Sequence, residues 1–146
     1  MTVVHEARMR ILYRDVDQMG IVYHPRYFEM FELGRTEFVR DEGFSYRAME
    51  EEMGLMLPVV TGQAWYHAPL HFDDLALIRT RVAAWSKTTI RYAYEVLAND
   101  DPTVRVTGEV ELACVRKADM KPARFPAALL DVFRRVAPDA YGRKRG

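Results

Sequence analysis

The chain has 146 residues, 49% of them hydrophobic, and its 21 acidic and 21 basic side chains cancel. This composition supplies a core for one domain of ordinary size and excludes a disordered chain. The sequence shows no membrane-length apolar run, no secretory signal, and a single cysteine, Cys114, which excludes an internal disulfide. We expect one domain over residues 1–146, with its core over 8–126, in the cytoplasm.

The charge is unevenly distributed along the chain. Residues 1–115 hold 12 Lys or Arg and 18 Asp or Glu, whereas residues 116–146 hold 9 and 3. A basic segment attracts phosphate groups, although residues 142–146 can equally form a solvated tail. No basic stripe with interleaved aromatic residues occurs, so we expect no nucleic-acid partner.

The hydrophobic pattern predicts a short strand over residues 8–14, followed by a long amphipathic helix over 27–42. Gly34 lies on the apolar face of that helix. Glycine there costs about 1 kcal/mol relative to alanine, which indicates that a sheet approaches the helix closely at this position. A second, short helix is expected over 46–53.

After Pro58 the apolar residues alternate with polar ones, which is typical of strands. The alternating segments are 60–68, 76–84, 90–98 and 104–114. Polar breaks separate them, which indicates antiparallel hairpins, and a last helix is expected over 127–136. One long helix against one antiparallel sheet is an α+β fold, and the open edges of such a sheet favour pairing with a second copy.

The segment 13–27, YRDVDQMGIVYHPRY, concentrates reactive side chains between the first strand and the long helix. It holds two carboxylates, a glycine, a histidine and three tyrosines, and loops held by rigid elements are where function concentrates. From the pattern alone, Asp15 and Asp17 are also compatible with capping a turn. The chain has no G-x-S-x-G elbow and no glycine-rich phosphate loop, and its four histidines lack a metal-like spacing.

The pattern D-x-D-x-x-G-x-V-Y-H-x-x-Y, which begins at Asp15, resembles the hotdog-fold acyl-CoA thioesterases. It is most similar to the 4-hydroxybenzoyl-CoA thioesterase-like group, which includes the Tol-Pal-associated acyl-CoA thioesterases. The helix sequence FEMFELGRTEFVRDEG and the segment YHAPLHFDDLALIRT continue the similarity, which covers about residues 9–126. The resemblance implies a hotdog fold, in which the sheet wraps one long helix, and thioester hydrolysis without a metal or cofactor.

The resemblance also implies roles for individual residues. Asp17 matches the catalytic carboxylate, and the backbone N–H of His24 matches the donor to the thioester carbonyl oxygen. Both roles are physically reasonable, because a helix N-terminus has unpaired N–H groups and a carboxylate can act as general base or nucleophile. Glu32 and Glu37 are alternative catalytic carboxylates. Residues expected to contact the substrate are Gly20, Tyr23 and Tyr27.

CoA carries phosphates, so its binding needs cations. In the resembled family the nucleotide lies at the surface near a hairpin and the last strand, which makes Lys87, Thr88, Arg116, Lys117 and Lys121 the candidates here. An acyl carrier protein is an alternative acyl donor, since it is acidic and carries a phosphate. We expect a homodimer, and pairing of dimers into a homotetramer.

Two other functions are compatible with the fold. A hotdog dehydratase would need a catalytic histidine motif that this chain lacks. A non-catalytic acyl-thioester binding or interaction protein could use the same pocket, although it would gain nothing from Asp17. The sequence leaves open whether the acyl group is aromatic or aliphatic. The candidates to shape its pocket are Met53, Met56, Gly62, Ala64, Trp65 and Tyr66.

Overall fold

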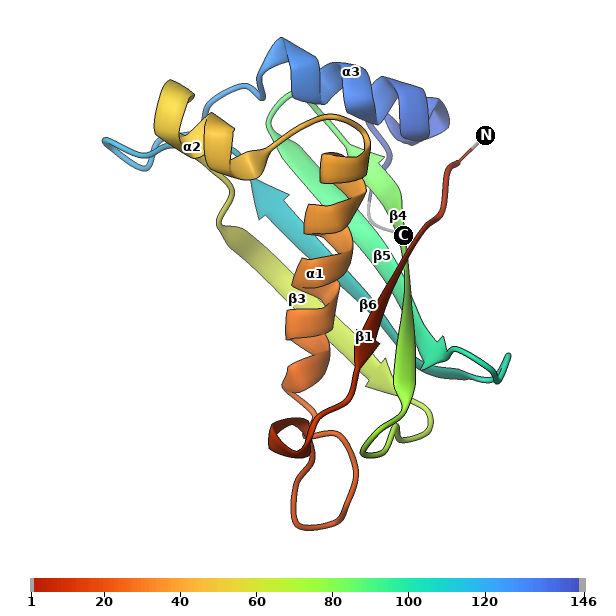
Figure 1. Ribbon diagram of the computed structural model, residues 1–146. Helices are drawn as coiled ribbons and strands as arrows, with labels where there is room; N and C mark the ends of the chain where they lie inside the picture. Colours follow the sequence, from red (N-terminus) through yellow and green to blue (C-terminus); the bar gives the residue numbers. More distant parts are fainter. Residues whose placement is uncertain (1, 145–146) are drawn as a thin grey trace.

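In the computed structural model, which describes residues 2–144, a five-stranded antiparallel sheet curves around the long helix α1 (Arg26–Asp41) (Figure 1). The strand order is β1-β4-β5-β6-β3. This is the hotdog α+β arrangement that the sequence predicts. The strands are β1 (His5–Arg10), β3 (Val59–Tyr66), β4 (Leu75–Trp85), β5 (Thr89–Ala98) and β6 (Val104–Ala113).

The smaller elements lie mainly at one end of this sheet. They are the helices α2 (Tyr46–Met53) and α3 (Ala127–Val136), the ribbon of β2 (Leu55–Met56) and β7 (Val115–Arg116), and the 3-10 turns η1 (Tyr13–Asp15) and η2 (Pro138–Ala140). Figure 1 shows α2 and α3 at one end, whereas the loop that precedes α1 lies at the other. No helix in the part of the chain that the structure describes is long and apolar enough to cross a membrane.

Most elements lie where the hydrophobic pattern predicts them, but the predicted first strand over 8–14 is wrong at both ends. β1 begins at His5 and ends at Arg10. The chain leaves the sheet there because the carboxylate of Asp15 accepts a hydrogen bond from the Leu12 N–H at 2.8 Å and fixes a turn. The β2–β7 ribbon has no counterpart in the hydrophobic pattern, since strands of two residues carry no periodicity.

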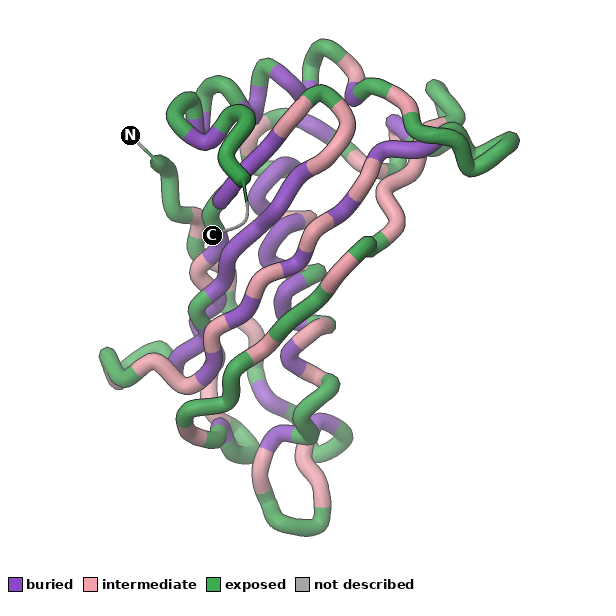
Figure 2. The backbone as a smooth tube through the Cα atoms, turned by 180° about the vertical axis from the view of Figure 1, so that it is seen from behind, coloured by how far each residue is buried: buried purple, intermediate pink, exposed green. Residues whose placement is uncertain are grey.

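The core lies between α1 and the concave face of the sheet (Figure 2). The helix approaches most closely where side chains are smallest. A Cβ atom added at Gly34 would lie 2.3 Å from the Thr80 Oγ1, and one added at Gly108 would lie 2.3 Å from the Phe31 ring. Gly34 therefore has the role predicted for it, because any side chain there would push the helix off the sheet.

Replacing Gly34 by alanine is expected to destabilise the fold. Helix propensity alone favours alanine by about 1 kcal/mol, but overlap with the Thr80 side chain outweighs this gain. We expect Gly34→Ala to lower the free energy of unfolding in urea by about 1–3 kcal/mol. Adding Thr80→Ala should restore part of the loss, since it removes the overlapping atoms. A Gly34→Ala protein as stable as the wild type would show that the contact is not tight.

Candidate active site

The segment between β1 and α1 forms a narrow loop at one end of the sheet (Figure 1). Val16 and Val22 pair as an antiparallel bridge, and the Asp17 N–H donates to the Ile21 carbonyl at 2.9 Å. Gly20 makes the turn with a φ of +78°, which glycine adopts without strain. Asp17 therefore lies at the base of the loop, where the backbone is held, rather than at its tip.

The two carboxylates of the motif have different surroundings. Asp15 is 4% exposed, and besides its bond from Leu12 it lies 3.9 Å from the Arg26 Nε. Asp17 is partly exposed, and its Oδ1 accepts one hydrogen bond, from the Met19 N–H at 2.8 Å. No residue among 2–144 bonds to its second oxygen. Asp15 thus holds the loop together, and Asp17 is the carboxylate available to a ligand.

The turn that leads into α1 presents a free backbone donor, two residues before the helix begins. The helix begins after Pro25 without a side-chain cap, and the Arg26 N–H donates to the Tyr23 carbonyl at 2.9 Å. The backbone N–H of His24 has no acceptor among the described residues. Because a helix N-terminus carries a partial positive charge, this N–H can polarise a carbonyl group or stabilise an oxyanion.

His24 is also one of the residues that line an apolar cavity of about 240 Å³. Its lining residues are Ile21, Val22, His24, Tyr27, Tyr66, His67, Ala68 and Pro69. The Tyr66 hydroxyl donates to the His24 carbonyl at 3.2 Å, and the Tyr27 hydroxyl accepts from the Leu70 N–H at 3.3 Å. Burial raises the pKa of both phenols, so both are neutral hydroxyls at neutral pH. The two tyrosines therefore fix one wall of the cavity and the peptide that begins α1.

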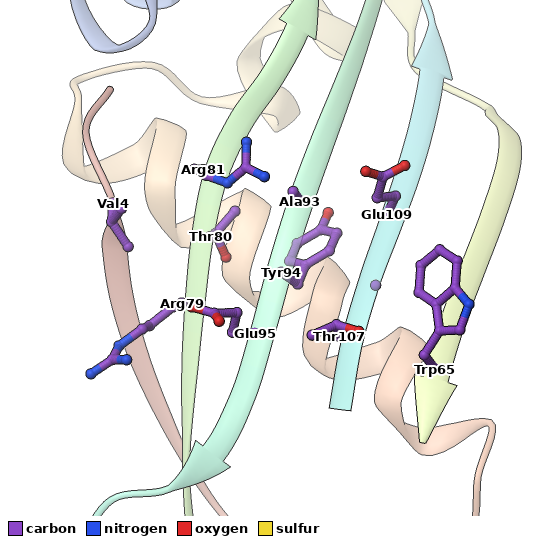
Figure 3. A pocket seen from close by; sticks show the side chains of 11 residues that line it. Val4, Trp65, Arg79, Thr80, Arg81, Ala93, Tyr94, Glu95, Thr107 and Glu109 are labelled. Atoms are coloured by element: carbon purple, nitrogen blue, oxygen red, sulfur yellow. The ribbon is translucent and has the colours of Figure 1, made fainter. Parts of the chain in front are cut away.

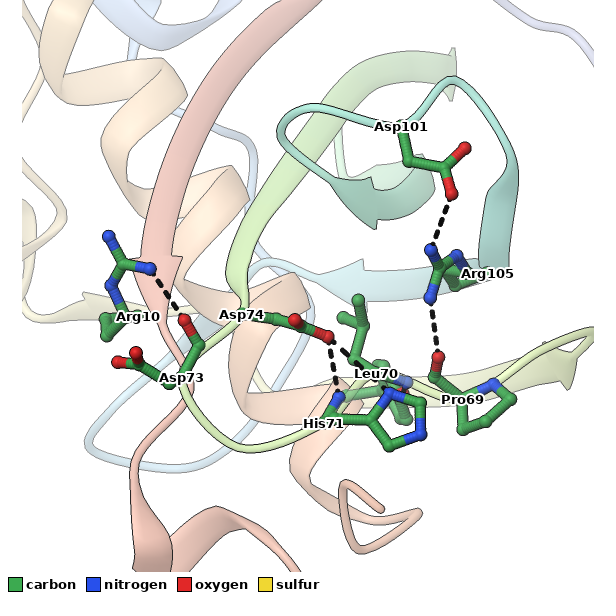
Figure 4. A network of polar contacts seen from close by, with 9 residues as sticks. Arg10, Pro69, Leu70, His71, Asp73, Asp74, Asp101 and Arg105 are labelled. Carbon is green, nitrogen blue, oxygen red and sulfur yellow. Dashed lines mark hydrogen bonds and ion pairs between the residues drawn. The ribbon is translucent and has the colours of Figure 1, made fainter. Parts of the chain in front are cut away.

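A polar network holds the loop between β3 and β4, which contains the cavity residue Pro69 (Figure 4). Arg105 donates to the Pro69 carbonyl at 2.7 Å and to the Asp101 carboxylate at 2.9 Å. The Asp74 carboxylate accepts from the His71 N–H at 2.8 Å. This loop between β3 and β4 also bonds to the loop before α1, through the Val22 N–H and the Leu70 carbonyl at 2.9 Å. The two loops at the cavity are therefore held to each other.

The alternative carboxylates lie away from this cavity. Glu37 forms an ion pair with Arg40 on the same helix. Glu32 lines a separate cavity of about 200 Å³ with Arg35 and Tyr46. Neither glutamate lines the cavity beside His24. Asp17 does not line it either, but its loop does, through Ile21 and Val22, and the Asp17 N–H bonds to the Ile21 carbonyl.

The residues predicted to bind CoA phosphates lie at the opposite end of the sheet. Lys87 and Thr88 form the β4–β5 turn, and Arg116, Lys117 and Lys121 follow β6 (Figure 1). Arg116 already forms an ion pair with Asp119 at 3.0 Å. This ion pair, together with the hydrogen bond from the Lys121 N–H, lowers the pKa of the Asp119 carboxyl. Lys117 and Lys121 have no ion pair within residues 2–144. One protomer therefore does not bring these cations to His24.

Tyr66 is the site residue whose role the sequence did not reveal. It is one of the residues named as candidates for the acyl pocket, but nothing in the pattern indicates its bond to the His24 carbonyl. The similarity of YHAPLHFDDLALIRT to the resembled family, which includes Tyr66, was the only available signal.

Comparisons with known proteins match this chain to thioesterases. Residues 11–133 match the thioesterase-like superfamily. The acyl-CoA thioesterase YbgC of Haemophilus influenzae is 34% identical over 125 residues, which cover 86% of this chain and 90% of that protein. The acyl-CoA thioester hydrolase YbgC of Escherichia coli O6:H1 is 31% identical over 127 residues, or 86% and 92% of the two chains. The crystal structure of a DHNA-CoA thioesterase from Staphylococcus aureus has a TM-score of 0.79 at 27% identity, and the match covers 93% of this chain and 85% of that one.

The different surroundings of Asp15 and Asp17 predict different effects on stability. Asp15→Ala leaves the part-buried Leu12 N–H without its acceptor, so we expect the free energy of unfolding to fall by about 1–3 kcal/mol. Asp17→Ala removes a partly exposed group and should change it by no more than about 0.5 kcal/mol. Urea denaturation measures both. The reverse order would mean that Asp17, not Asp15, holds the loop.

Proposed function

The chain belongs to the thioesterase-like superfamily of thioester hydrolases, and on this premise we propose that it hydrolyses an acyl-CoA to the free acid and CoA. Asp17 is the catalytic carboxylate, and the His24 N–H is the donor to the thioester carbonyl oxygen. The observation that carries the proposal is that His24, just before α1, has a free backbone N–H and lines an apolar cavity. Asp17 lies in the adjoining loop, where its side chain accepts one local hydrogen bond, from the Met19 N–H.

The chemistry follows from the charge that develops during attack. When a nucleophile adds to the thioester carbon, negative charge builds on the carbonyl oxygen, and one preformed N–H donor stabilises it by about 3–4 kcal/mol. The apolar walls of the cavity lower the local dielectric and strengthen this interaction. Asp17 either removes a proton from the attacking water or attacks the carbon itself, forming an anhydride that water then opens. In both routes the C–S bond breaks, and the CoA sulfur leaves as a thiolate that takes up a proton.

We propose that the active enzyme is a dimer paired through β3. This strand is an edge of the sheet, and it carries exposed apolar side chains at Val59, Val60 and Trp65. An open edge of this kind is a template for pairing with another strand. Two copies of β3 can pair antiparallel about a two-fold axis, which extends the sheet across both protomers.

This pairing brings opposite ends of the two protomers together. β3 runs from the β2–β7 ribbon towards the cavity, because Val59 follows β2 closely whereas Tyr66 bonds to His24. An antiparallel neighbour therefore presents its basic turn at the cavity. The partner's Lys117 and the partner's Lys121 are then the cations for the CoA phosphates, which resolves their separation from His24 within one chain.

Asp17→Asn is expected to abolish turnover while leaving the loop intact, because the amide oxygen can still accept from the Met19 N–H. We expect free-thiol release from acyl-CoAs to fall by about a hundredfold or more, the usual cost of losing a general base. The panel is benzoyl-, 4-hydroxybenzoyl-, short-chain and palmitoyl-CoA, which also ranks the acyl groups. Asp131→Asn, an exposed carboxylate on α3, is the matched control and should retain full activity.

Other outcomes have defined meanings. Equal activity in Asp17→Asn and the wild type would transfer the catalytic role to Glu32 or Glu37. Absence of turnover on every acyl-CoA, and on acyl carrier protein thioesters, would favour the non-catalytic binding protein.

Removal of the two free lysines tests the cross-protomer phosphate site. We expect the double variant Lys117→Ala/Lys121→Ala to raise KM for acyl-CoA roughly tenfold, because two charge-assisted contacts to phosphate are lost. Acyl-pantetheine lacks the nucleotide phosphates, so its KM should not change. An equal rise in KM for both substrates would show that the lysines act on the fold rather than on the phosphates.

A further inference from the structure

The buried face of α1 carries an arginine that no carboxylate neutralises. Arg35 is 8% exposed, and its one hydrogen bond to a described residue is donated to the Tyr94 hydroxyl at 3.4 Å. It forms no ion pair within residues 2–144. An arginine side chain keeps its charge at every physiological pH, and a buried charge without a partner is strongly destabilising. The fold therefore holds a positive charge that it does not itself balance.

Two arginines of the sheet, by contrast, have an acidic neighbour. Figure 3 shows the outer face of the sheet, where Arg79 lies at an open hollow of about 410 Å³. Its side chain is 38% exposed and pairs with Glu6 at 3.2 Å. Arg91, the other buried arginine of the described chain, has Glu111 of β6 as its cross-strand neighbour. Arg35 differs from both, since it combines burial with the absence of an ion-pair partner.

The tyrosines beside Arg35 supply no negative charge. The hydroxyls of Tyr46 and Tyr92 share a hydrogen bond of 2.8 Å, and the Tyr94 hydroxyl accepts from Arg35. Burial raises the pKa of all three phenols, that of Tyr46 to about 12, so all three remain neutral at neutral pH. Most of the guanidinium N–H donors of Arg35 therefore have no acceptor within the described chain.

Arg35 lines a cavity of about 200 Å³, which has room for a carboxylate on a short carbon chain. Tyr46 and Met49 of α2 line it as well, together with Leu57 and Leu112. An arginine side chain binds the two oxygens of a carboxylate through parallel hydrogen bonds, which fixes the direction of the ligand. The apolar walls strengthen such a contact, because they lower the local dielectric constant.

We propose that this cavity binds a carboxylate group, with Arg35 as its counter-ion and the hydroxyls of Thr36 and Tyr46 as further donors. Thr36 lines the cavity and has no hydrogen bond to a described residue. Glu32 and Glu50 also line the cavity, but both are exposed, so water screens their charge. A singly charged carboxylate balances Arg35, whereas a phosphate dianion would add an excess negative charge beside the two glutamates.

The acyl group of the substrate is one source of this carboxylate, and that assignment rests on the proposed function and its dimer. Leu57 lies just before β3, and Leu112 is opposite Val59 in the register of β3 and β6. In a dimer paired through β3, the start of this strand lies beside the end of the partner's β3, near the partner's His24. An acyl group bound there can extend towards Arg35. The substrate is then a monothioester of a dicarboxylic acid, and hydrolysis gives the diacid and CoA.

A free carboxylic acid is the other source of the same group. Thioester hydrolysis releases an acid, which can occupy the cavity without a thioester being present. Because Arg35 and the other lining residues belong to one protomer, binding of a free acid requires neither the dimer nor turnover. Titration with a free acid therefore tests the cavity even if the protein hydrolyses no acyl-CoA.

Calorimetric titration of the full chain with valerate, and with pentanamide as its neutral counterpart, measures binding of a free carboxylate. We expect valerate to bind at least about tenfold more tightly than pentanamide, and Arg35→Met to lower the affinity for valerate at least about tenfold, because the charge-assisted contact is lost. Arg35→Lys keeps the charge without the planar fork and should fall between the two. Arg47→Met, an exposed arginine of α2, is the matched control and should bind valerate as the wild type does.

Thioesterase assays test the acyl group as the source. The panel compares succinyl-, glutaryl- and adipyl-CoA with butyryl-, valeryl- and hexanoyl-CoA, which have the same numbers of acyl carbon atoms. For at least one pair we expect a higher kcat/KM for the dicarboxylic thioester, and Arg35→Met should reduce this preference at least about tenfold. The preference should persist in Arg47→Met.

The outcomes separate the two sources and the two proposals. A preference that depends on Arg35 identifies the acyl group as the source, whereas valerate binding that depends on Arg35 without such a preference identifies a free acid. Absence of turnover on every acyl-CoA contradicts the proposed function, while the valerate titration still decides the cavity. Valerate binding and substrate preference that are both unchanged in Arg35→Met would overturn the carboxylate site.

A second variant covers the case in which Arg35→Met does not fold by circular dichroism. Glu32→Gln removes a like charge from the same cavity at an exposed position, so it should raise the affinity for valerate about two- to threefold. An unchanged or lower affinity in Glu32→Gln would contradict a carboxylate bound at Arg35.

Discussion

The close contact between α1 and the concave face of the sheet determines where everything else can lie. The helix can reach the strands because Gly34 and Gly108 provide no side chain at the two points of contact. That contact sets the direction of the helix axis, so the first residues of α1 arrive at the end of β3. There Tyr66 bonds to the carbonyl of His24 and leaves the N–H of the same residue free. A packing constraint in the middle of the helix thereby determines where the free N–H of His24 lies, just before the helix begins.

The loop before α1 divides two tasks between two aspartates of one motif. Asp15 is buried and accepts the Leu12 N–H, which ends β1 and closes the turn. Asp17 accepts only a local hydrogen bond from the Met19 N–H, so its second carboxylate oxygen has no hydrogen-bond partner among the described residues. A carboxylate used to hold the loop could not also take part in chemistry without loosening it. Asp17 therefore keeps an accessible carboxylate because Asp15 holds the turn.

The sequence predicts the elements that carry a periodic pattern and misses the contacts that depend on tertiary structure. α1, α3 and the strands β3 to β6 follow from periods of 3.6 and 2, and the resemblance to a family points to Asp17 and His24. The hydrophobic pattern misses the end of β1 because the Asp15 carboxylate, rather than a neighbouring strand, accepts the hydrogen bond from the Leu12 N–H. The bond between Tyr66 and His24 joins residues 42 positions apart, and only the folded sheet brings them together. The sequence offers the cations after β6 as candidates for the CoA phosphates, but only the topology shows that they lie at the other end of the sheet from His24.

The proposed mechanism depends on the His24 N–H, which we propose binds the thioester carbonyl oxygen. A crystal structure with an acyl-CoA analogue in which CH₂ replaces the sulfur tests this contact, because the ketone keeps the carbonyl but cannot be hydrolysed. We expect the ketone oxygen about 2.7–3.1 Å from the His24 nitrogen, the acyl group in the cavity beside Tyr27 and Tyr66, and Asp17 near the carbonyl carbon. An analogue whose carbonyl is bound elsewhere, with the His24 N–H still free, would contradict it.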